Sequence, residues 1–405
     1  MPGSTGFARH QFLESRYAVK IALFCNEFPP RQHGGIGSFT LSYARALLAK
    51  GHATTVVEFG EAARIRDHEG VRVITLAAPS RIRGTTDFRL RYRLWRWANA
   101  EAKRGDLDVF ELPEYDGMMP FPLRECAAVL RLHISRRVVQ HDLGTKGSLK
   151  LNVFESLTLR CNRNWIGVSR HILDHTQKVF GIHPRNSTVV LNPVADPNLS
   201  MRVPAASNEA GSLQPYILFA GYVGERKGAL LLAEAARELF AKYPDLRLVY
   251  VGLENDYQGK PASHKILSIL GKEFGGRTHF TGPRPHAEVL EWMRKAAVVC
   301  LPSRSESFGL VPVEAMMLGR PVVYTRCGPG PEVVDDGKTG LLCDAFDATE
   351  LAAKIDQFLS RPSWAESIGN HASQVARERF NMSQCVSQSL DFYQTLVARQ
   401  AGGGN

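Results

Sequence analysis

One segment decides the fold: residues 298–316, which read VVCLPSRSESFGLVPVEAM. Its four leading apolar residues predict a buried strand that ends at Leu301, and a polar loop follows that strand. Pro312 favours the first turn of a helix that begins near Val311, because the N–H group that proline lacks has no partner there. The free N–H groups of Phe308 to Val311 therefore face the strand end and can hold a phosphate. The segment predicts a strand–loop–helix unit with an anion site.

The same alternation of strands and helices runs through the rest of the chain and predicts parallel α/β sheets. In the first half we expect strands at 19–25, 54–59, 109–112, 127–132, 165–169 and 188–191, and a helix at 38–50. The polar stretch 197–214 predicts a linker. Beyond it we expect strands at 216–221, 246–251, 298–301 and 321–324, with helices at 229–242 and 348–359.

This restart of the pattern, in a chain of 405 residues, predicts two domains. We expect a flexible N-terminus at 1–17, Rossmann-like domains at 18–200 and 201–385, and a C-terminal helix in 386–405 that crosses back to the first domain before a Gly-rich tail. Ligands of parallel sheets bind at the carboxyl ends of the strands. We therefore expect the site in a cleft where the strand ends of the two domains face each other.

Composition excludes several classes of protein. The chain is 44% hydrophobic and 22% charged, typical of a globular protein, and has no apolar run near the ~20 residues of a membrane span. Residues 1–17 lack the apolar core of a secretory signal. The seven cysteines form no zinc-ligand pair and suit a reducing cytosol, so we expect no metal site. The net charge of +10 leaves nucleic acid, an anionic membrane and a phosphate-bearing substrate open.

Two carboxylates stand out in the opening segment. Glu306 lies in the predicted loop and Glu314 lies just inside the predicted helix on the same side. Each can accept hydrogen bonds from sugar hydroxyls. The alternative is a capped helix that carries two solvated acids.

The spacing of these two acids resembles the Glu-x7-Glu motif of glycosyltransferase family 4, a family of retaining enzymes with the GT-B fold. The resemblance covers about residues 18–390. It implies that Glu314 holds the nucleotide ribose and that Glu306 contacts the donor sugar. It also implies a donor-binding role for the connecting residues Ser307, Phe308, Gly309 and Leu310.

The segment from Glu27 to Gly37 is similar to the first loop of the family. Its glycines Gly34, Gly35 and Gly37 are implied to let the backbone approach the donor phosphates and the acceptor, because only glycine allows that approach without a Cβ clash. A plain tight turn is the alternative. The resemblance to the family implies that residues 18–200 form the acceptor-side domain and that residues 201–385 form the donor domain.

Residues 219–228 resemble the family's Gly-Arg-x4-Lys-Gly motif, whose Arg and Lys neutralise the diphosphate. Lys227 matches the Lys, whereas Tyr222 occupies the place of the Arg. A phenol supplies no positive charge, so Arg226 is the nearest candidate to replace it. Solvated surface charges are the alternative for both basic residues.

His133 directly follows the run 129–132, at the end of a predicted buried strand. It is similar to the family's histidine near the reaction centre. The pair His141-Asp142, which we expect in the following loop, is the second candidate for this histidine. The alternative for His133 is a buried histidine whose hydrogen bonds are satisfied within the fold. Residues 328–332 are similar to a Gly-rich wall of the donor pocket. Residues 281–284, with Arg284, stand where family members hold the base.

The segment from Arg81 to Arg104 points to a partner. It carries eight Lys or Arg and two acidic residues, interleaved with aromatic residues. Such a segment can lie on an anionic membrane, where many acceptors of the family reside. The alternative is an ordinary helix with a basic solvated face and buried aromatics. We expect no nucleic-acid partner, because no binding module accompanies the charge.

Together these features predict a retaining glycosyltransferase of polysaccharide biosynthesis with His133, Glu306 and Lys227 as catalytic residues. The donor is a nucleotide-diphosphate sugar, with UDP favoured over GDP, and the acceptor is a glycan, lipid-linked or small-molecule hydroxyl. We expect front-face attack without a metal or other cofactor. We expect a cytoplasmic protein, peripheral on the inner face of the membrane if the basic segment anchors it. The alternatives are a sugar-nucleotide epimerase or phosphorylase on the same fold, and an inactive sugar-nucleotide-binding partner.

Overall fold

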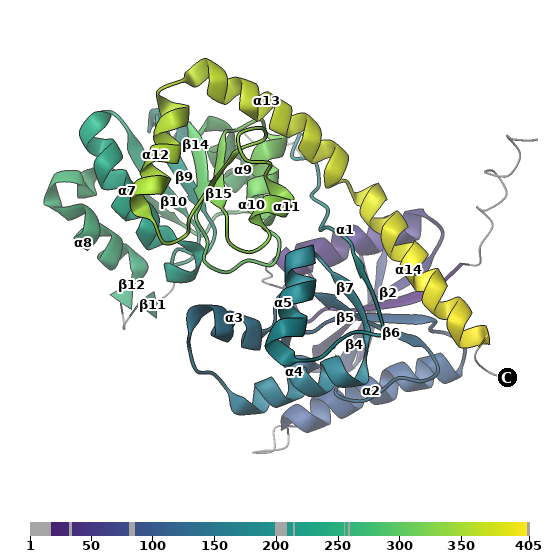
Figure 1. Cartoon of the computed structure of the whole chain (residues 1–405). Coiled ribbons are helices and arrows are strands. Elements are labelled where there is room, and N and C mark those ends of the chain that lie inside the picture. Colours follow the sequence, from purple (N-terminus) through teal and green to yellow (C-terminus); the bar gives the residue numbers. More distant parts are fainter. Residues whose placement is uncertain are drawn as a thin grey trace, which may run out of the picture. The chain divides into compact units, whose positions relative to one another are not determined.

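The computed structural model describes residues 18–31, 35–80, 86–198, 209–213, 215–254, 256–257 and 260–402. The predicted N-terminus at 1–17 and most of the predicted linker at 197–214 lie outside these residues. The described residues form two large sheets and one small hairpin (Figure 1). Both large sheets are mostly parallel, so the predicted α/β class with two Rossmann-like sheets is confirmed.

The first sheet has eight strands in the order β3-β4-β2-β1-β5-β6-β7-β8. These strands are β1 (Lys20–Phe24), β2 (Ala53–Gly60), β3 (Arg64–His68), β4 (Val71–Ala77), β5 (Val109–Pro113), β6 (Ala127–Leu132), β7 (Asn164–Gly167) and β8 (Asn186–Val189). Strand β3 is the exception to the parallel order, because it pairs antiparallel with β4. That edge hairpin was not predicted. Its turn is made by Glu69 and Gly70, both with positive φ.

The second sheet has six strands in the order β13-β10-β9-β14-β15-β16. They are β9 (Tyr216–Ala220), β10 (Arg247–Val251), β13 (Thr278–Gly282), β14 (Val298–Leu301), β15 (Val322–Thr325) and β16 (Leu341–Cys343). The small hairpin joins β11 (Asp256–Tyr257) to β12 (Lys260–Pro261). Strands β9, β14 and β15 are buried along their whole length, as continuous apolar runs in parallel sheets predict.

Contacts divide the chain into two compact units. Unit 1 contains residues 1–112, 122–129 and 390–405, and unit 2 contains residues 113–121 and 130–389. The predicted domain boundaries near residues 200 and 385 stay a prediction.

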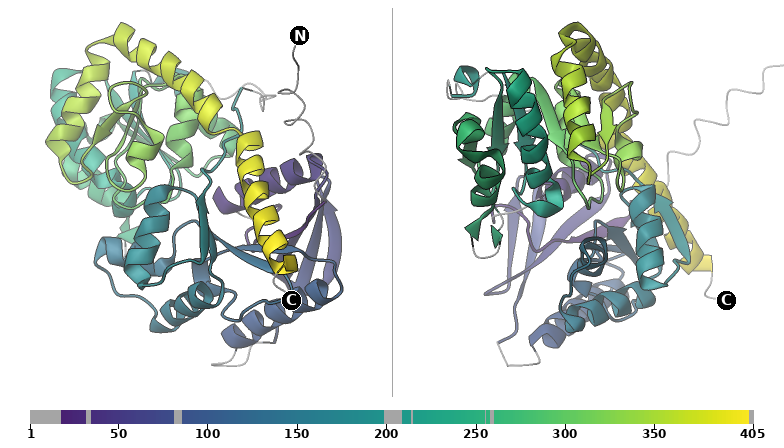
Figure 2. Two further views of the ribbon diagram at one scale, coloured as in Figure 1. Left: turned by 45° about the vertical axis from the view of Figure 1, so that its right-hand side comes forward. Right: turned by 60° about the vertical axis from the view of Figure 1, so that its left-hand side comes forward.

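Unit 1 is built around strands β1 to β4. Helix α1 (Gly35–Ala49) buries Phe39, Tyr43 and Leu47, and helix α2 (Thr86–Lys103) lies on the other face of these strands (Figures 1 and 2). The end of α14 (Met382–Gly402) also belongs to this unit. The Tyr393 hydroxyl on α14 lies 2.9 Å from the Tyr43 hydroxyl and donates a hydrogen bond to Glu111 on β5.

Unit 2 contains the second sheet and the last strands of the first. Helices α7 (Ala229–Lys242), α8 (Ala262–Phe274) and α12 (Ala348–Leu359) cover one face of the second sheet. Helices α9 (His286–Lys295), α10 (Leu310–Met317) and α13 (Pro362–Arg379) cover the other face (Figure 1). The same unit holds α3 (Arg136–Leu143), α4 (Leu149–Cys161) and α5 (Arg170–Phe180), together with α6 (Glu209–Ser212) and α11 (Gly330–Val333).

Candidate functional site

The loop after β14 brings Glu306 against Lys227. The Lys227 Nζ lies 2.5 Å from Glu306 Oε1, and the Ser303 hydroxyl donates to the same oxygen at 3.0 Å. Strands β9 and β14 are neighbours, so the loops that follow them meet at the carboxyl edge of the second sheet. Burial lowers the pKa of Lys227, an effect that the Glu306 carboxylate opposes. Two predicted catalytic residues therefore form one ion pair at the edge where ligands bind.

Two glycines permit the close packing of these loops. Gly228 has a φ of 79°, and a Cβ at this position would lie 2.1 Å from the Pro302 carbonyl oxygen. Gly309 has a φ of 94°, and its Cβ would lie 2.3 Å from the Tyr324 hydroxyl oxygen. Any side chain at either position would separate the two loops or shift the start of α10.

Arg226 lies beside the same loop. Its guanidinium donates to the Ser305 carbonyl at 3.2 Å, and its own carbonyl accepts a bond from the Arg304 N–H at 2.9 Å. Tyr222, which stands where the family has an Arg, is 50% exposed. Arg226 is thus the basic residue next to Lys227 at this edge, and its role as the replacement for the absent Arg stays a prediction.

Glu314 lies inside α10 as predicted, and its side chain is 13% exposed. Its Oε1 lies 2.9 Å from Nε2 of His286, the first residue of α9. The hydrogen bond to Glu314 raises the pKa of His286. The sequence did not predict His286 as a partner of Glu314. In the structure His286 contacts one of the two carboxylate oxygens that we expect to bind the ribose.

The residues between the two acids have different surroundings. The Phe308 ring is 1% exposed and packs edge-on against Phe380, so its side chain belongs to the core. The Ser307 carbonyl accepts a bond from the Ser169 hydroxyl at 2.7 Å. Leu310 is the first residue of α10, which places Pro312 in the first turn as predicted. The N–H groups at the start of this helix are the predicted anion site of the segment, and that role stays a prediction.

The pair His141-Asp142 lies in the last turn of α3 rather than in a loop. Asp142 accepts a hydrogen bond from the Ser305 hydroxyl at 2.6 Å and lies 2.6 Å from His175 Nε2. Its pKa is lowered because the hydrogen bonds from His175 and Ser305 outweigh the effect of burial. The second histidine candidate of the sequence thus stands directly beside the Glu306 loop.

The side chains of His141, Asp142 and His175 also form the one group among the described residues that could hold a metal ion. Their ligand atoms lie within 4.8 Å of one another. The metal-free mechanism stays a prediction that chelation tests.

Helix α5 is tied to the Gly-rich wall predicted at 328–332. The Glu332 carboxylate accepts the N–H groups of Arg170 at 2.6 Å and of His171 at 2.7 Å, which stabilises the helix N-terminus. A Cβ on Gly328 would lie 3.7 Å from the His171 ring and 3.4 Å from the Glu306 carbonyl oxygen. The wall, the start of α5 and the Glu306 loop are therefore neighbours.

His133 directly follows β6 and is 8% exposed. Burial lowers the pKa of His133 to about 3, so its ring is neutral at physiological pH. Its backbone N–H and that of Ile134 both donate to the fully buried Glu114 carboxylate, at 3.0 and 2.7 Å. Ile134 has a φ of 139°, a conformation that is strained for a β-branched residue. Glu114 holds this strained turn in place.

The other predicted residues take part in none of the contacts described above or lie outside the described chain. Gly34 is outside the described residues, and Gly35 and Gly37 lie in the first turn of α1 in unit 1. Arg284 follows β13, and its guanidinium lies 3.8 Å from Glu288. Their donor-binding roles stay predictions.

Sequence reasoning missed the roles of Glu114, His171, His175 and His286. The four-residue spacing of His171 and His175 was a usable signal, because it places both rings on one face of a helix. Their rings stack with centroids 5.1 Å apart. Glu114 and His286 gave no comparable signal, since their partners lie 19 to 28 residues away in sequence.

The chain matches two family descriptions along most of its length. Residues 33–196 match "Glycosyltransferase Family 4" and residues 205–375 match "Glycosyl transferases group 1". The chain belongs to glycosyltransferase family 4. The family is one of retaining enzymes, and both matched segments contain residues of the site described above.

Curated relatives agree with this family over shorter segments. The D-inositol 3-phosphate glycosyltransferase of Corynebacterium urealyticum is 34% identical over 183 residues, which is 44% of this chain and 42% of the relative. The enzyme of the same name from Kribbella flavida is 32% identical over 235 residues, which is 55% of this chain and 54% of the relative. The matched segments span about half the length of these relatives.

Solved structures show the fold. Sucrose-phosphate synthase of Thermosynechococcus elongatus has a TM-score of 0.70 at 24% identity and covers 93% of this chain and 99% of its own. HepE of Anabaena, solved in complex with UDP and glucose, has a TM-score of 0.70 at 20% identity. The match covers 93% of this chain and 100% of the HepE chain. This family 4 chain therefore has the predicted GT-B fold.

Proposed function

We propose that this family 4 chain transfers a sugar from a nucleotide-diphosphate donor, with UDP favoured over GDP, to a hydroxyl acceptor with retention of configuration. The observation that carries the proposal is the ion pair of Lys227 with Glu306 beside the N-terminus of α10. A cation, a carboxylate and free backbone N–H groups then converge at one sheet edge. A nucleotide-diphosphate sugar presents the matching chemistry, with its phosphates, hydroxyls and anomeric carbon.

Each part of the donor has a partner in this proposal. Glu314 accepts hydrogen bonds from the ribose hydroxyls. It does so with Oε2, or with Oε1 after the ribose displaces His286 from that oxygen. Lys227, Arg226 and the first N–H groups of α10 bind the diphosphate. Glu306 accepts hydrogen bonds from the sugar hydroxyls. The base lies near residues 281–284.

The transfer uses front-face attack. The acceptor oxygen bonds to the anomeric carbon as the bond to the diphosphate oxygen breaks, and that departing oxygen accepts the proton of the acceptor. Lys227 and the N–H groups of α10 stabilise the developing charge, which is the largest contribution expected of the protein. His133, neutral because burial lowers its pKa to about 3, serves as a hydrogen-bond partner of the sugar rather than as a cation.

The hydrogen bond between Asp142 and Ser305 positions the loop that carries Glu306. Asp142 also lies 2.6 Å from His175, so its orientation is fixed from two sides. This placement assigns Asp142 and His175 to positioning the loop.

The experiment that tests the proposal is a turnover assay with purified protein. UDP release from UDP-sugars is measured with and without hydroxyl acceptors, and the product anomer is assigned by NMR. Retained configuration with free UDP supports the proposal. Phosphate-dependent cleavage supports a phosphorylase, an altered free UDP-sugar supports an epimerase, and saturable binding without any turnover supports an inactive binding partner.

We also propose that α2 attaches the protein to an anionic membrane surface. Phe88 and Tyr92 on this helix are 51% and 43% exposed, and their rings stack in line with that of Trp95. Arg93 and Arg96 are exposed on the same helix. The aromatics therefore face outward together with the positive charges, as an interfacial helix requires. No helix within the described part of the chain is long and apolar enough to cross a membrane.

Vesicle co-sedimentation tests this attachment. Vesicles with anionic lipid should pull down the protein at low salt, neutral vesicles much less, and added salt should release it. Changing Arg89, Arg93 and Arg96 to Gln should abolish sedimentation and leave UDP binding intact. The same number of charges removed from α7 and α8, at Arg237, Lys265 and Lys272, should change little. Equal binding to both kinds of vesicle would contradict the attachment.

A further inference from the structure

Three side chains beside the Glu306 loop have the chemistry of metal ligands. His141 and Asp142 come from the last turn of α3, and His175 comes from the middle of α5. All three belong to unit 2, and their ligand atoms lie within 4.8 Å of one another. The transfer proposed above uses Asp142 and His175 only to position the loop, so the three ligands are open to a second role.

The distances between the ligand atoms are close to those around a bound ion. A tetrahedral metal with bonds of about 2.0 Å holds its ligand atoms about 3.3 Å apart. His141 Nδ1 lies 3.5 Å from Asp142 Oδ1, and His175 Nε2 lies 2.6 Å from the same oxygen. An ion would take the place of the proton in the shorter contact and would separate its two atoms by about 0.7 Å. Small side-chain movements are therefore enough to form the site.

The surroundings of the three ligands also suit an ion. Asp142 Oδ2 accepts a hydrogen bond from the Ser305 hydroxyl at 2.6 Å, and such outer bonds orient the carboxylates that bind metals. The His171 ring stacks on the His175 ring with centroids 5.1 Å apart, which restricts rotation of the ligand ring. The His141 side chain is 55% exposed, so an ion can enter from solvent on that side.

The kinds of atom in this set favour zinc over magnesium. Two imidazole nitrogens and one carboxylate oxygen are typical ligands of Zn²⁺. Mg²⁺ instead takes oxygen ligands in octahedral geometry. Three protein ligands leave the fourth position of a tetrahedral Zn²⁺ for water. The set is thus sufficient for a Zn²⁺ ion taken up from solution.

Helix α5 is fixed at its start, which determines how the site adjusts to an ion. The Ser169 hydroxyl donates to the Ser307 carbonyl at 2.7 Å. The Glu332 carboxylate accepts the N–H groups of the first two residues of α5. The last turn of α3 has no such ties to Glu332 or Ser307 among the printed contacts of the described residues, so α3 is the element that moves.

Movement of α3 reaches the loop that carries Glu306. When Asp142 moves away from His175, its bond to the Ser305 hydroxyl lengthens. The ion also balances the charge of Asp142, which makes this carboxylate a weaker acceptor for Ser305. Both effects weaken the contact that holds the loop, and Ser305 directly precedes Glu306.

We propose that His141, Asp142 and His175 bind Zn²⁺, and that the bound ion slows sugar transfer by loosening the Glu306 loop. The site regulates the enzyme and takes no part in the chemistry of transfer. The effect on turnover rests on the proposed function, whereas metal binding stands on the geometry of the three ligands.

Calorimetry with ZnCl₂ and MgCl₂ tests the binding. Zn²⁺ should bind the wild-type protein one-to-one, and Mg²⁺ should not bind measurably. His141→Ala should weaken Zn²⁺ binding about tenfold or more, because it removes a ligand. His264→Ala, a matched change of an exposed histidine on α8, should have no effect. Equal Zn²⁺ affinity in wild-type and His141→Ala protein would overturn the inference.

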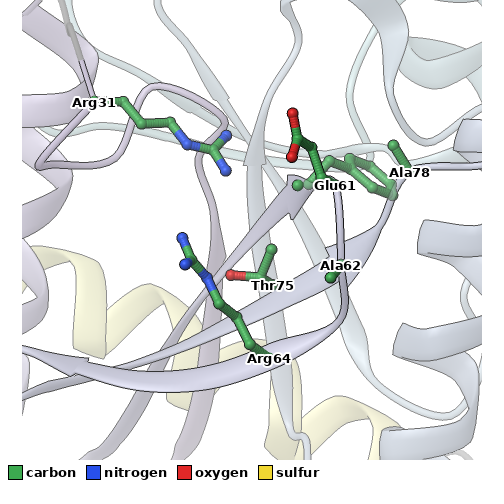
Figure 3. Close-up of a pocket in the computed structure, with 8 residues that line it drawn as sticks. Arg31, Glu61, Ala62, Arg64, Thr75 and Ala78 are labelled. Atoms are coloured by element: carbon green, nitrogen blue, oxygen red, sulfur yellow. The ribbon is translucent and has the colours of Figure 1, made fainter.

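The carboxylate ligand has its own control in unit 1. Glu61 lies at the rim of a cavity of about 740 Å³ whose other charged groups are Arg31 and Arg64 (Figure 3). A guanidinium group has no acceptor atom to offer a metal, so this cavity should not hold Zn²⁺. Glu61→Gln should leave Zn²⁺ affinity unchanged, whereas Asp142→Asn should lower it about tenfold or more. Equal affinity in these two variants would contradict the assigned ligands.

The UDP-release assay tests the effect on turnover. Zn²⁺ should lower the kcat of the wild-type protein several-fold, and EDTA should restore it. His141→Ala, compared with its own rate without zinc, should lose this inhibition. Equal inhibition of both proteins would mean that Zn²⁺ acts on the nucleotide instead, and Zn²⁺ binding without inhibition would refute the effect on the loop.

These measurements separate the zinc site from the proposed function. Normal turnover in a protein that binds no Zn²⁺ refutes the zinc site alone. Zn²⁺ binding that depends on His141, in a protein that releases no UDP from any UDP-sugar, refutes the transfer and leaves the metal assignment intact.

Discussion

Replacement of Glu114 by Gln should make the stability of the protein less dependent on pH. Burial raises the pKa of Glu114 to about 7 from its ordinary 4.5, and it outweighs the two backbone N–H donors of His133 and Ile134. Between these pH values the folded state keeps a proton that the unfolded state has lost. The free energy of unfolding therefore falls as pH rises from 4.5 to 7 and then stays level.

The size of this effect follows from the pKa. Each pH unit between the two values is worth about 1.4 kcal/mol, so the Glu114 contribution falls by about 3 kcal/mol over the interval. Glu114→Gln has no group that titrates there. Urea denaturation of both proteins at pH 4.5 and pH 7.5 gives the difference in unfolding free energy at each pH, and that difference should shift by about 3 kcal/mol in favour of the variant.

Glu125→Gln, a change of an exposed carboxyl, is the control and should show no such shift. A stability difference between wild type and Glu114→Gln that is the same at both pH values would refute the reasoning. It would mean that folding does not raise the pKa of Glu114.

Three further outcomes are expected at the donor site. Lys227→Ala should lower kcat about a hundredfold or more in the UDP-release assay, because the leaving group loses its stabilising charge. Lys242→Ala, a change on the surface, should leave kcat unchanged. Equal rates in wild-type, Lys227→Ala and Lys242→Ala protein would exclude a catalytic role for Lys227. The affinity for UDP should rise as pH increases through the raised pKa of His286, because protonated His286 competes with the ribose for Glu314, and His286→Gln should flatten the profile measured by calorimetry. Transfer should survive EDTA, and complete loss restored by Mg²⁺ or Mn²⁺ would contradict the metal-free mechanism.

The fold was predictable because its central strands are continuous apolar runs. Residues 298–301 and 216–220 form β14 and β9, within a residue of the expected ranges. The β3 strand, with the sequence RIRDH, was missed because an exposed edge strand has no apolar alternation. Whether the aromatics on α2 are buried was also open from the sequence: Phe88 and Tyr92 are exposed, whereas Trp95 and Trp97 are half-buried.

The site was predictable only in its local parts. The start of α10 follows from Gly309 and Pro312, which act within a few residues. The bond between Asp142 and Ser305 joins residues 163 positions apart, and no local pattern encodes such a contact. The sequence therefore predicts which polar residues follow a strand. Which of these residues contact one another depends on how the loops pack, and the sequence does not show that packing.

The measurement that tests the central claim most directly is calorimetric titration of UDP into wild-type, Glu314→Ala and Glu234→Ala protein. Loss of the carboxylate at Glu314 removes a charged hydrogen-bond acceptor worth about 1.5–3 kcal/mol, so the affinity should fall roughly 10- to 150-fold. Glu234, exposed on α7, should be replaceable without effect. Affinities for UDP and GDP that are unchanged by Glu314→Ala would contradict the donor site described here.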